Sequence, residues 1–256
     1  MVSYFFSIII PTYNEEENLP FLLNALEKQT KKDFEIIVVD SLSKDKTLTV
    51  IKEFQKRIPN LRYFQKKMKN VSQARNFGAK NALGRYIIFF DADVIPEENF
   101  IRQIEEKITK NNLDLTTVWN RSKRKKLTGR LILLLLNISM TLFQKIKPAA
   151  NGPCIIIKKS VFNQIGGFDE EIVFGEDFDL VQRASKLKAK FQVFRYPLLY
   201  VSTRRFEKEG LILSLYKSIK AVFYQLFFGP IKKPIFEYQM GGEYYKKRAV
   251  LCHKVW

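Results

Sequence analysis

The stretch that most constrains the fold of this chain is an apolar run that ends abruptly in two carboxylates. Residues 86–90 are all branched or aromatic, and Asp91-Ala92-Asp93 follows directly. An unbroken run of this kind predicts a strand that is buried on both faces of a sheet. At the end of such a strand the backbone turns, so both carboxylates can approach one hard cation, Mg²⁺ or Mn²⁺. Taken alone, the pattern equally describes an ordinary polar strand end.

Strand and helix patterns alternate through the first part of the chain. Apolar runs at 7–10, 34–39 and 61–64 are each followed by a predicted helix, the first at 15–28, the second after the loop 41–47, and the third at 72–83. Such alternation predicts a parallel sheet with right-handed crossovers, in which ligands bind at the carboxyl ends of the strands. Asp40, Asp91 and Asp93 all fall at that edge, so we expect the binding site there.

The later part of the chain continues this pattern and then becomes more basic. Further helices are predicted at 97–111, 158–165 and 176–187, and further strands at 113–119, 154–157 and 191–200. We expect one catalytic domain at 1–206, which includes a basic amphipathic insertion at 121–147. An amphipathic, basic tail at 207–256 follows it.

Charge and cysteine content limit the partners and the compartment. The net charge of +18 over 256 residues predicts an anionic partner, either nucleic acid, anionic lipid or a phosphorylated substrate. The two cysteines, Cys154 and Cys252, lie far apart and outside any metal-ligand spacing, which fits a reducing compartment. The N-terminus lacks the pattern of a signal peptide. We therefore expect a cytoplasmic protein.

Two apolar segments with basic flanks point to a membrane surface. The run at 131–143 follows a cluster of Lys and Arg and falls short of the about 20 residues that span a bilayer. It predicts a helix lying in the interface of an anionic membrane, and a buried core helix with solvated basic ends is the alternative. The second segment, 211–228, predicts an amphipathic helix with Ser214, Lys217, Ser218 and Gln225 on one face.

Six short motifs occur in a characteristic order along the chain. They are Ile10-Pro11-Thr12-Tyr13-Asn14-Glu15-Glu16, Val39-Asp40, Ala74-Arg75-Asn76, Asp91-Ala92-Asp93, Gly166-Gly167-Phe168-Asp169 and Gly175-Glu176-Asp177. Together they resemble the family 2 glycosyltransferases, which are inverting enzymes of the GT-A fold, over roughly residues 5–206. The resemblance implies a Rossmann-like α/β fold whose mostly parallel central sheet is flanked by helices.

The resemblance also assigns roles on the donor side of the site. It places Pro11, Tyr13 and Glu15 in the loop that cups the nucleotide, and Asp40 at the base or the ribose. By the residues alone, Asp40 could instead cap a helix.

The Arg75-Asn76 pair would lie by the nucleotide, although the same pair also suits a solvated helix face. Asp91 and Asp93 would hold the divalent metal on the diphosphate, with Asp91 and Ala92 contacting the nucleotide sugar.

On the acceptor side, Asp177 matches the catalytic base of the family. Acids in the first turn of a helix are also an ordinary N-terminal preference, so the residue type alone does not require this role. Arg204 or Arg205 could clamp the diphosphate with a guanidinium fork, and a basic surface pair is the alternative. The chain lacks the Gln-x-x-Arg-Trp motif of many processive relatives, which argues against a polymerising synthase.

These expectations combine into one functional hypothesis. The chain would transfer a sugar from a UDP- or GDP-sugar to a hydroxyl of a glycan or lipid-linked acceptor, in a metal-dependent, inverting reaction. It would act in the cytoplasm, peripheral on the inner face of the cell membrane. A polyprenyl-phosphate glycosyltransferase is the alternative. A nucleic-acid-binding protein is not expected, because no helix-turn-helix, zinc or RNA-binding aromatic motif is present.

Overall fold

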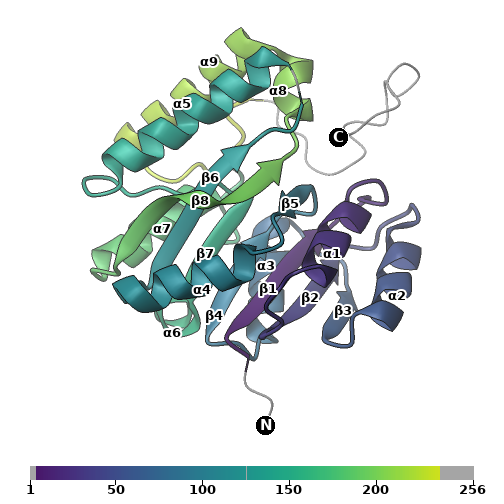
Figure 1. The fold of residues 1–256 in the computed structure, drawn as a ribbon. Helices are drawn as coiled ribbons and strands as arrows, with labels where there is room; N and C mark the ends of the chain where they lie inside the picture. The colour runs from purple at the N-terminus through teal and green to yellow at the C-terminus, as the bar shows by residue number, and fades with distance from the viewer. Residues whose placement is uncertain (1–3, 125, 237–256) are drawn as a thin grey trace.

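An eight-stranded sheet forms the centre of the computed structural model, which describes residues 4–124 and 126–236 (Figure 1). The strand order is β3-β2-β1-β4-β7-β6-β8-β5. Helices flank the sheet on both faces, so the expected α/β fold with a mostly parallel central sheet is confirmed. The bounds of the strands are β1 (Phe6–Thr12), β2 (Phe34–Asp40), β3 (Leu61–Gln65), β4 (Tyr86–Phe90), β5 (Val94–Pro96), β6 (Leu115–Arg121), β7 (Cys154–Lys158) and β8 (Phe191–Val201).

The two halves of the sheet differ in strand direction. Strands β1 to β4 are parallel to one another, which aligns their carboxyl ends along one edge. Strand β7 then runs antiparallel to both β4 and β6, while β8 pairs parallel with β6 and antiparallel with β5. The predicted strand or strands at 191–200 form one strand, β8, and the β6·β8 register shifts between Val118 and Asn120.

Helices bury their apolar stripes on the two faces of the sheet. One face carries α1 (Leu19–Glu27), α2 (Thr47–Arg57) and α4 (Phe100–Asn111). The other carries α3 (Val71–Lys80), α6 (Lys159–Gln164) and α7 (Glu176–Lys186). Both faces of β1, β2 and β4 are therefore in the core, which explains why their sequences are apolar without alternation.

Two helices begin later than the sequence predicts. The acidic run from Glu15 belongs to a loop, and α1 begins at Leu19. The backbone N–H of Glu15 and of Glu16 instead donate to Thr47 Oγ1 and to Asp45 Oδ2. Helix α4 begins at Phe100, because the chain before it forms β5 and the Glu97 N–H then donates to the Leu198 carbonyl.

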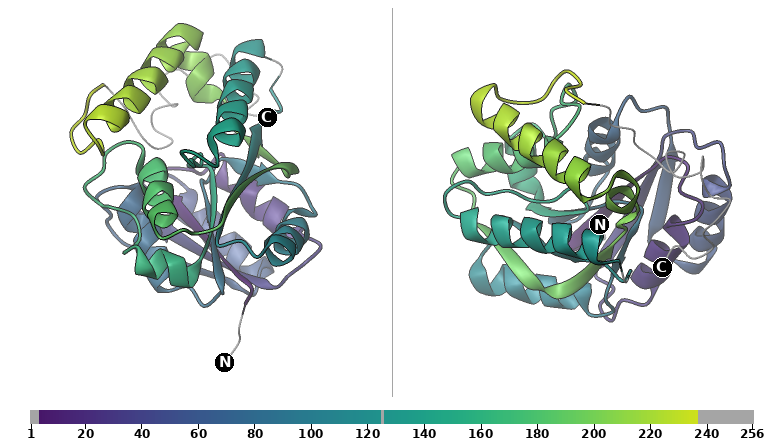
Figure 2. Two further views of the ribbon diagram at one scale, coloured as in Figure 1. Left: turned by 90° about the vertical axis from the view of Figure 1, so that its left-hand side faces the viewer. Right: turned by 90° about the horizontal axis from the view of Figure 1, so that it is seen from above.

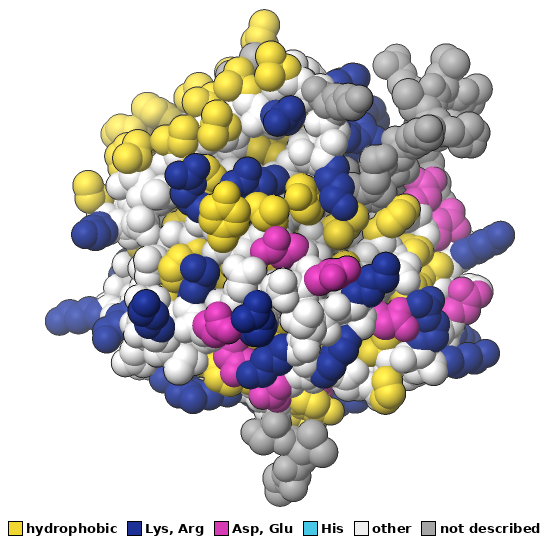
Figure 3. Space-filling view, viewed as in Figure 1, with side chains coloured by type: hydrophobic (Ala, Val, Ile, Leu, Met, Phe, Trp, Pro, Cys, Tyr) yellow, Lys and Arg dark blue, Asp and Glu magenta, His cyan; other side chains and the backbone are white. Residues whose placement is uncertain are grey.

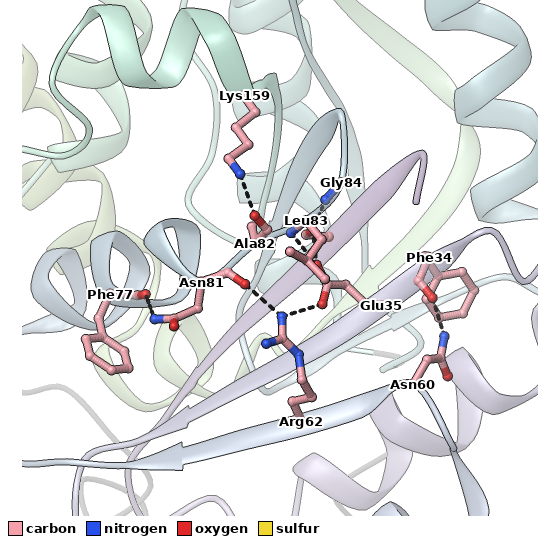
Figure 4. A network of polar contacts seen from close by, with 11 residues as sticks. Phe34, Glu35, Asn60, Arg62, Phe77, Asn81, Ala82, Leu83, Gly84 and Lys159 are labelled. Carbon is pink, nitrogen blue, oxygen red and sulfur yellow. Dashed lines mark hydrogen bonds and ion pairs between the residues drawn. The ribbon is translucent and has the colours of Figure 1, made fainter. Parts of the chain in front are cut away.

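A polar network ties together the amino ends of the parallel strands (Figure 4). The buried Glu35 carboxylate accepts hydrogen bonds from Ser7 Oγ at 2.6 Å and from the Leu83 N–H at 2.5 Å. Arg62 pairs with the same carboxylate at 2.6 Å. The Gly84 N–H completes the network by donating to Ser7 Oγ at 2.7 Å. The network fixes the turn that leads into β4.

Three further helices lie together at one end of the molecule (Figures 1 and 2). They are α5 (Leu127–Phe143), α8 (Arg204–Glu209) and α9 (Leu211–Phe227). None of the helices in the described part of the chain is long and apolar enough to cross a membrane. Of the tail that the sequence predicts at 207–256, residues 237–256 lie outside the described part of the chain.

Candidate functional site

The loops that follow β1 and β2 are joined by reciprocal hydrogen bonds at the carboxyl edge of the sheet. The Asn14 N–H donates to Ser43 Oγ at 2.9 Å, and the Lys44 N–H donates to Asn14 Oδ1 at 2.8 Å. Asn14 adopts a left-handed backbone, with φ of 56°, which asparagine tolerates better than most residues. Pro11 and Tyr13 lie half-buried beside it. The loops predicted to cup a nucleotide are thus built as one unit.

Asp40 lies fully buried at the end of β2, next to Thr12 at the end of β1. Its carboxylate accepts hydrogen bonds from the Ser43 N–H at 3.1 Å and from Gln65 Nε2 at 3.3 Å, and also from Ser43 Oγ. Helix α2 begins only at Thr47, so Asp40 does not cap it. The carboxylate holds the turn after β2, and its predicted contact with a nucleotide stays a prediction.

Three carboxyl groups gather near the end of β4. The pKa of Glu15 is raised to about 8, first by burial and then by the negative charges of Asp93 and Asp91, against the hydrogen bond from Asn18 and the charge of Arg204. Asp91 and Asp93 flank the buried Ala92, and both remain partly exposed. The local excess of negative charge means that a cation would be stabilised here.

This donor set fits a hard divalent metal. Carboxylate oxygens are the ligands that Mg²⁺ and Mn²⁺ prefer, and magnesium-like ions commonly take one or two of them and complete the shell with phosphate and water. No group of three or more His, Cys, Asp or Glu side chains that could hold a metal occurs within residues 4–124 and 126–236. Asp91 and Asp93 would therefore hold the ion together with a bound diphosphate.

Arg75 connects the predicted metal ligand to the residue that precedes the predicted base. Its side chain is only 2% exposed, and its guanidinium donates to Asp91 Oδ1 at 2.7 Å and to Glu176 Oε1 at 2.9 Å. It also donates to the Gly152 carbonyl at 3.3 Å and lies over the Phe168 ring. The alternative of a solvated helix face is wrong for Arg75. The side chain instead holds the ends of β4 and α7 together.

Asn76 faces the glycine turn that precedes the acidic loop. Its Nδ2 donates to the Phe168 carbonyl at 2.9 Å, and the Phe168 N–H donates to its Oδ1 at 2.8 Å. A Cβ on Gly167 would lie 2.7 Å from the same Oδ1, so only glycine allows this close approach. The sequence resemblance placed Asn76 beside the nucleotide. The structure places it against the turn that leads to Asp177.

Asp177 lies in the first turn of α7, beside Glu176 and Gly152. Burial and the negative charge of Glu176 raise the pKa of Asp177 to about 7, against the Phe178 N–H, Arg75 and the Gly152 backbone, which lower it. Its Oδ1 accepts the Phe178 N–H at 2.8 Å. A carboxylate with a pKa near neutrality can accept a proton at physiological pH, as a general base must.

The predicted arginine pair has only one member whose side chain is described. Arg204 is nearly buried at the start of α8, and its Nε donates to Ser202 Oγ at 3.0 Å. It lies 3.9 Å from Glu17 and lowers the pKa of Glu15 by its charge. Arg204 therefore lies near the carboxyl groups of Glu15, Asp91 and Asp93. The side chain of Arg205 lies outside what the structure describes.

Glu176 and Ser43 were not among the predicted site residues. The structure brings Glu176 into the site through its ion pair with Arg75, and Ser43 through its hydrogen bonds with Asn14 and Asp40. Glu176 lies in one of the six motifs, and Ser43 lies in the loop that follows another, Val39-Asp40. Their roles depend on which of several neighbouring polar side chains turns inward, and periodicity carries no signal for that.

Known proteins share parts of this chain. An uncharacterised glycosyltransferase of Haemophilus influenzae is 29% identical over 190 residues, which are 68% of this chain and 60% of that protein. A dolichyl N-acetyl-α-D-glucosaminyl phosphate glucuronosyltransferase of Methanococcus voltae is 40% identical over 102 residues. That match covers 38% of this chain and 32% of the relative, so the chain spans about a third of that protein's length.

Solved structures share the architecture. Residues 1–349 of Staphylococcus aureus TarS in complex with UDP-GlcNAc align with a TM-score of 0.62 and 23% identity, over 77% of this chain and 58% of that one. A mannosyltransferase of Pyrobaculum calidifontis in complex with GDP-Man and Mn²⁺ aligns with a TM-score of 0.64 and 18% identity, over 84% of this chain and 64% of that one. These likenesses establish the GT-A fold.

The sequence family itself is established by a match that covers more than half of the chain. Residues 7–166 match the family described as Glycosyl transferase family 2. The matched region runs from β1 to the glycine turn that Asn76 holds. It contains Asp40, Arg75, Asp91 and Asp93. The chain therefore belongs to glycosyl transferase family 2.

Proposed function

We propose that the protein transfers a sugar from a nucleotide diphosphate to an acceptor hydroxyl, with inversion at the anomeric carbon. The observation that carries this proposal is the pair of contacts made by Arg75. One guanidinium binds both Asp91, at the strand end where the metal and diphosphate would sit, and Glu176, the neighbour of Asp177. Arg75 thereby holds the proposed metal and diphosphate site next to the proposed general base.

The donor would occupy the carboxyl edge of β1, β2 and β4. Pro11, Tyr13, Glu15 and Asp40 would contact the nucleoside, and Asp91, Ala92 and Asp93 would face the diphosphate. Arg75 and Asn76 would keep the carboxylates and the glycine turn in place around it. The relatives that bind UDP-GlcNAc or GDP-Man support a UDP- or GDP-sugar, because they place such donors on the same fold.

Asp177 would act as the general base. The acceptor hydroxyl must lose a proton as its oxygen bonds to the anomeric carbon and the bond to the diphosphate breaks. Asp177 takes that proton on the acceptor side, and attack opposite the leaving diphosphate inverts the configuration. A bound Mg²⁺ or Mn²⁺ would neutralise negative charge on the diphosphate. Arg204 and Arg205 are further candidates for contacts with that group.

The acceptor is proposed to be a glycan or lipid-linked hydroxyl at the inner face of the cell membrane. A carboxylate whose pKa is raised to about 7 suits the removal of a hydroxyl proton. A polyprenyl phosphate would need no such base, because it is already anionic at neutral pH. The proposed catalytic domain is 1–206, and 207–256 would be the membrane-associated tail.

A donor screen tests this proposal. UDP-, GDP- and TDP-sugars are incubated with the protein and Mn²⁺, and the release of nucleoside diphosphate is measured with and without a chelator. We expect the wild type to release nucleoside diphosphate from a UDP- or GDP-sugar, and we expect the chelator to stop this release. The Asp91→Asn variant should show no release. Glu106→Gln, an exposed carboxylate of α4, serves as the control. Donor turnover that survives both the chelator and Asp91→Asn would contradict the proposal.

A further inference from the structure

Helices α5 and α9 expose apolar stripes with the same spacing. In α5 the stripe consists of the exposed side chains of Leu127, Leu131, Leu134, Leu135, Ile138 and Leu142. In α9 they are Ile212, Leu213, Tyr216, Ile219, Phe223 and Phe227. Each set recurs at three- and four-residue intervals over four turns, so it lies along one side of its helix. Exposed apolar surface that is continuous over two helices marks a site of interaction.

The buried faces of these helices contain polar side chains as well as apolar ones. Asn137 of α5 is buried, accepts the Asn120 N–H at 3.0 Å and donates to the Asn120 carbonyl at 2.8 Å, at the irregular register of β6. In α9, Ser214 and Ala221 are buried, and Gln225 reaches the Gly175 carbonyl at 3.5 Å. A helix on a water-facing surface would not expose so many large apolar side chains. The outward faces are suited to a partner that excludes water.

The charge around the stripes identifies the partner. Neither α5 nor α9 contains an acidic residue, and α9 carries Lys220 as well as Lys217, whose charge is paired with Glu209 of α8 at 2.9 Å. Arg130 of α5 is exposed, and so are Lys126 and Lys145 just beyond its two ends. Figure 3 shows hydrophobic side chains gathered at the end where α5 and α9 lie, with Lys and Arg side chains in a band beneath them. An apolar face with a basic border complements an anionic bilayer, whereas a second copy would bring like charges together.

The same helices contact the loops that carry the proposed catalytic groups. Gly175, which Gln225 contacts, immediately precedes Glu176 and Asp177. Gly129 of α5 packs so closely on Thr203 that a Cβ would lie 2.7 Å from the Thr203 Cβ, and Arg204 is the next residue. A surface that binds to these stripes would therefore lie close to the acceptor side of the site.

We propose that the outward faces of α5 and α9 form a docking surface for an anionic lipid bilayer. Docking would hold a hydroxyl that is carried on a lipid of the same bilayer near Asp177. This part of the inference rests on the proposed function. Docking is peripheral, since the apolar side chains enter the boundary of the acyl region while the lysines stay at the headgroups. The surface thus supplies a physical reason for a membrane-borne acceptor.

The test compares two matched triple variants of the full chain in vesicle sedimentation. The docking variant is Ile219→Gln/Phe223→Gln/Phe227→Gln in α9. The control is Phe21→Gln/Leu83→Gln/Leu187→Gln, which changes exposed apolar side chains outside α5 and α9. Vesicles consist of phosphatidylcholine, with or without phosphatidylglycerol. We expect the wild type to partition onto the mixed vesicles more strongly, and added salt to release part of it.

The docking variant should lose about tenfold or more in partition coefficient, and the control should stay within about twofold of the wild type. Donor turnover without vesicles should be the same in all three proteins, so a failure of docking is distinguishable from a failure of the proposed transfer. The proposal is overturned if the wild type stays in the supernatant at low salt. It is also overturned if the docking variant sediments with the vesicles as the wild type does. A dimer that only the docking variant breaks would assign the face to a second copy instead.

Discussion

The two ends of the parallel sheet use buried charge in opposite ways. At the amino end, Glu35 is matched by Ser7, Leu83 and Arg62, each within 2.6 Å. At the carboxyl end, Glu15 and Asp177 have pKa values raised to about 8 and about 7. The first arrangement lowers the energy of the folded state. The second disfavours the ionised form of both carboxyl groups, which is common at sites that bind or react.

The largest expected effect at the carboxyl end is on rate. Replacing Asp177 with Asn should lower single-turnover sugar transfer about 10²- to 10⁴-fold at matched donor occupancy, because the acceptor hydroxyl loses its base. The fold should persist, since Asn keeps the shape of the side chain.

The control is Asp179→Asn in the same helix, whose carboxylate pairs with Arg183 at 2.7 Å. Its rate should stay near that of the wild type. A loss below about tenfold for Asp177→Asn would remove the general-base role and favour the polyprenyl-phosphate acceptor.

At the amino end the largest effect should fall on stability. Glu35→Ala removes the acceptor for Ser7 Oγ and the Leu83 N–H and leaves Arg62 with only the Asn81 carbonyl. We expect the free energy of unfolding in urea to fall by about 2–4 kcal/mol, because buried donors lose their acceptor. Transfer per folded molecule should stay unchanged.

The matched control is Glu106→Ala, whose pair with Arg102 is exposed on both sides. It should change the free energy of unfolding by less than about 1 kcal/mol. If Glu35→Ala were as mild as this control, the network in Figure 4 would be incidental to the fold.

The pH dependence of stability distinguishes the two ends further. The pKa of Asp177 is raised from 3.8 in the unfolded reference to about 7 in the folded protein. Between these values the folded state binds one proton more, so the free energy of unfolding falls as pH rises from about 4 to about 7. The Asp177→Asn variant has no carboxyl group at this position, so this decrease in the free energy of unfolding should be absent from it.

Urea unfolding at about pH 5 and about pH 8, with a chelator and no donor, measures the effect. The stability of Asp177→Asn relative to wild type should be greater at the higher pH. An equal difference at both pH values would mean that Asp177 ionises in the folded protein as it does in the unfolded chain.

The sequence predicted the architecture well because the parallel strands carry unbroken apolar runs. Strands β1, β2 and β4 are buried on both faces, and the acids that follow them had to lie at one edge once the order of elements was known. Family motifs then supplied the expected roles.

Contacts between distant residues could not be predicted in the same way. Arg75 reaches Glu176, and Asn76 reaches Phe168, each across more than ninety residues. Nothing in their local sequence distinguishes these directions from contacts with solvent or a nucleotide. The choice between a core helix and a surface helix for 131–143 was equally open, because the helix has one buried face and one exposed face.

The smallest expected effects come from replacing one glycine with alanine at each end of the parallel sheet, Gly84 at the amino end and Gly152 at the carboxyl end. Gly84 lies against the backbone of β1, where an added Cβ would be 2.5 Å from the Phe6 carbonyl carbon and the Ser7 nitrogen. Because backbone cannot yield as a flexible side chain does, Gly84→Ala should cost about 1–3 kcal/mol of unfolding free energy. At Gly152 an added Cβ would be 3.4 Å from Asp177 Oδ2, an ordinary contact distance.

Gly152→Ala should therefore change stability by less than about 0.5 kcal/mol. Its methyl group would lie against the carboxylate of the proposed base and displace water from it, so it should raise the pKa of Asp177 and move the rising limb of kcat/KM to higher pH. Gly84→Ala should leave that limb in place. The same added methyl group would then change stability at one end of the sheet and the pH profile at the other. If Gly152→Ala lowered stability as much as Gly84→Ala did, the carboxyl end would be as tightly packed as the amino end.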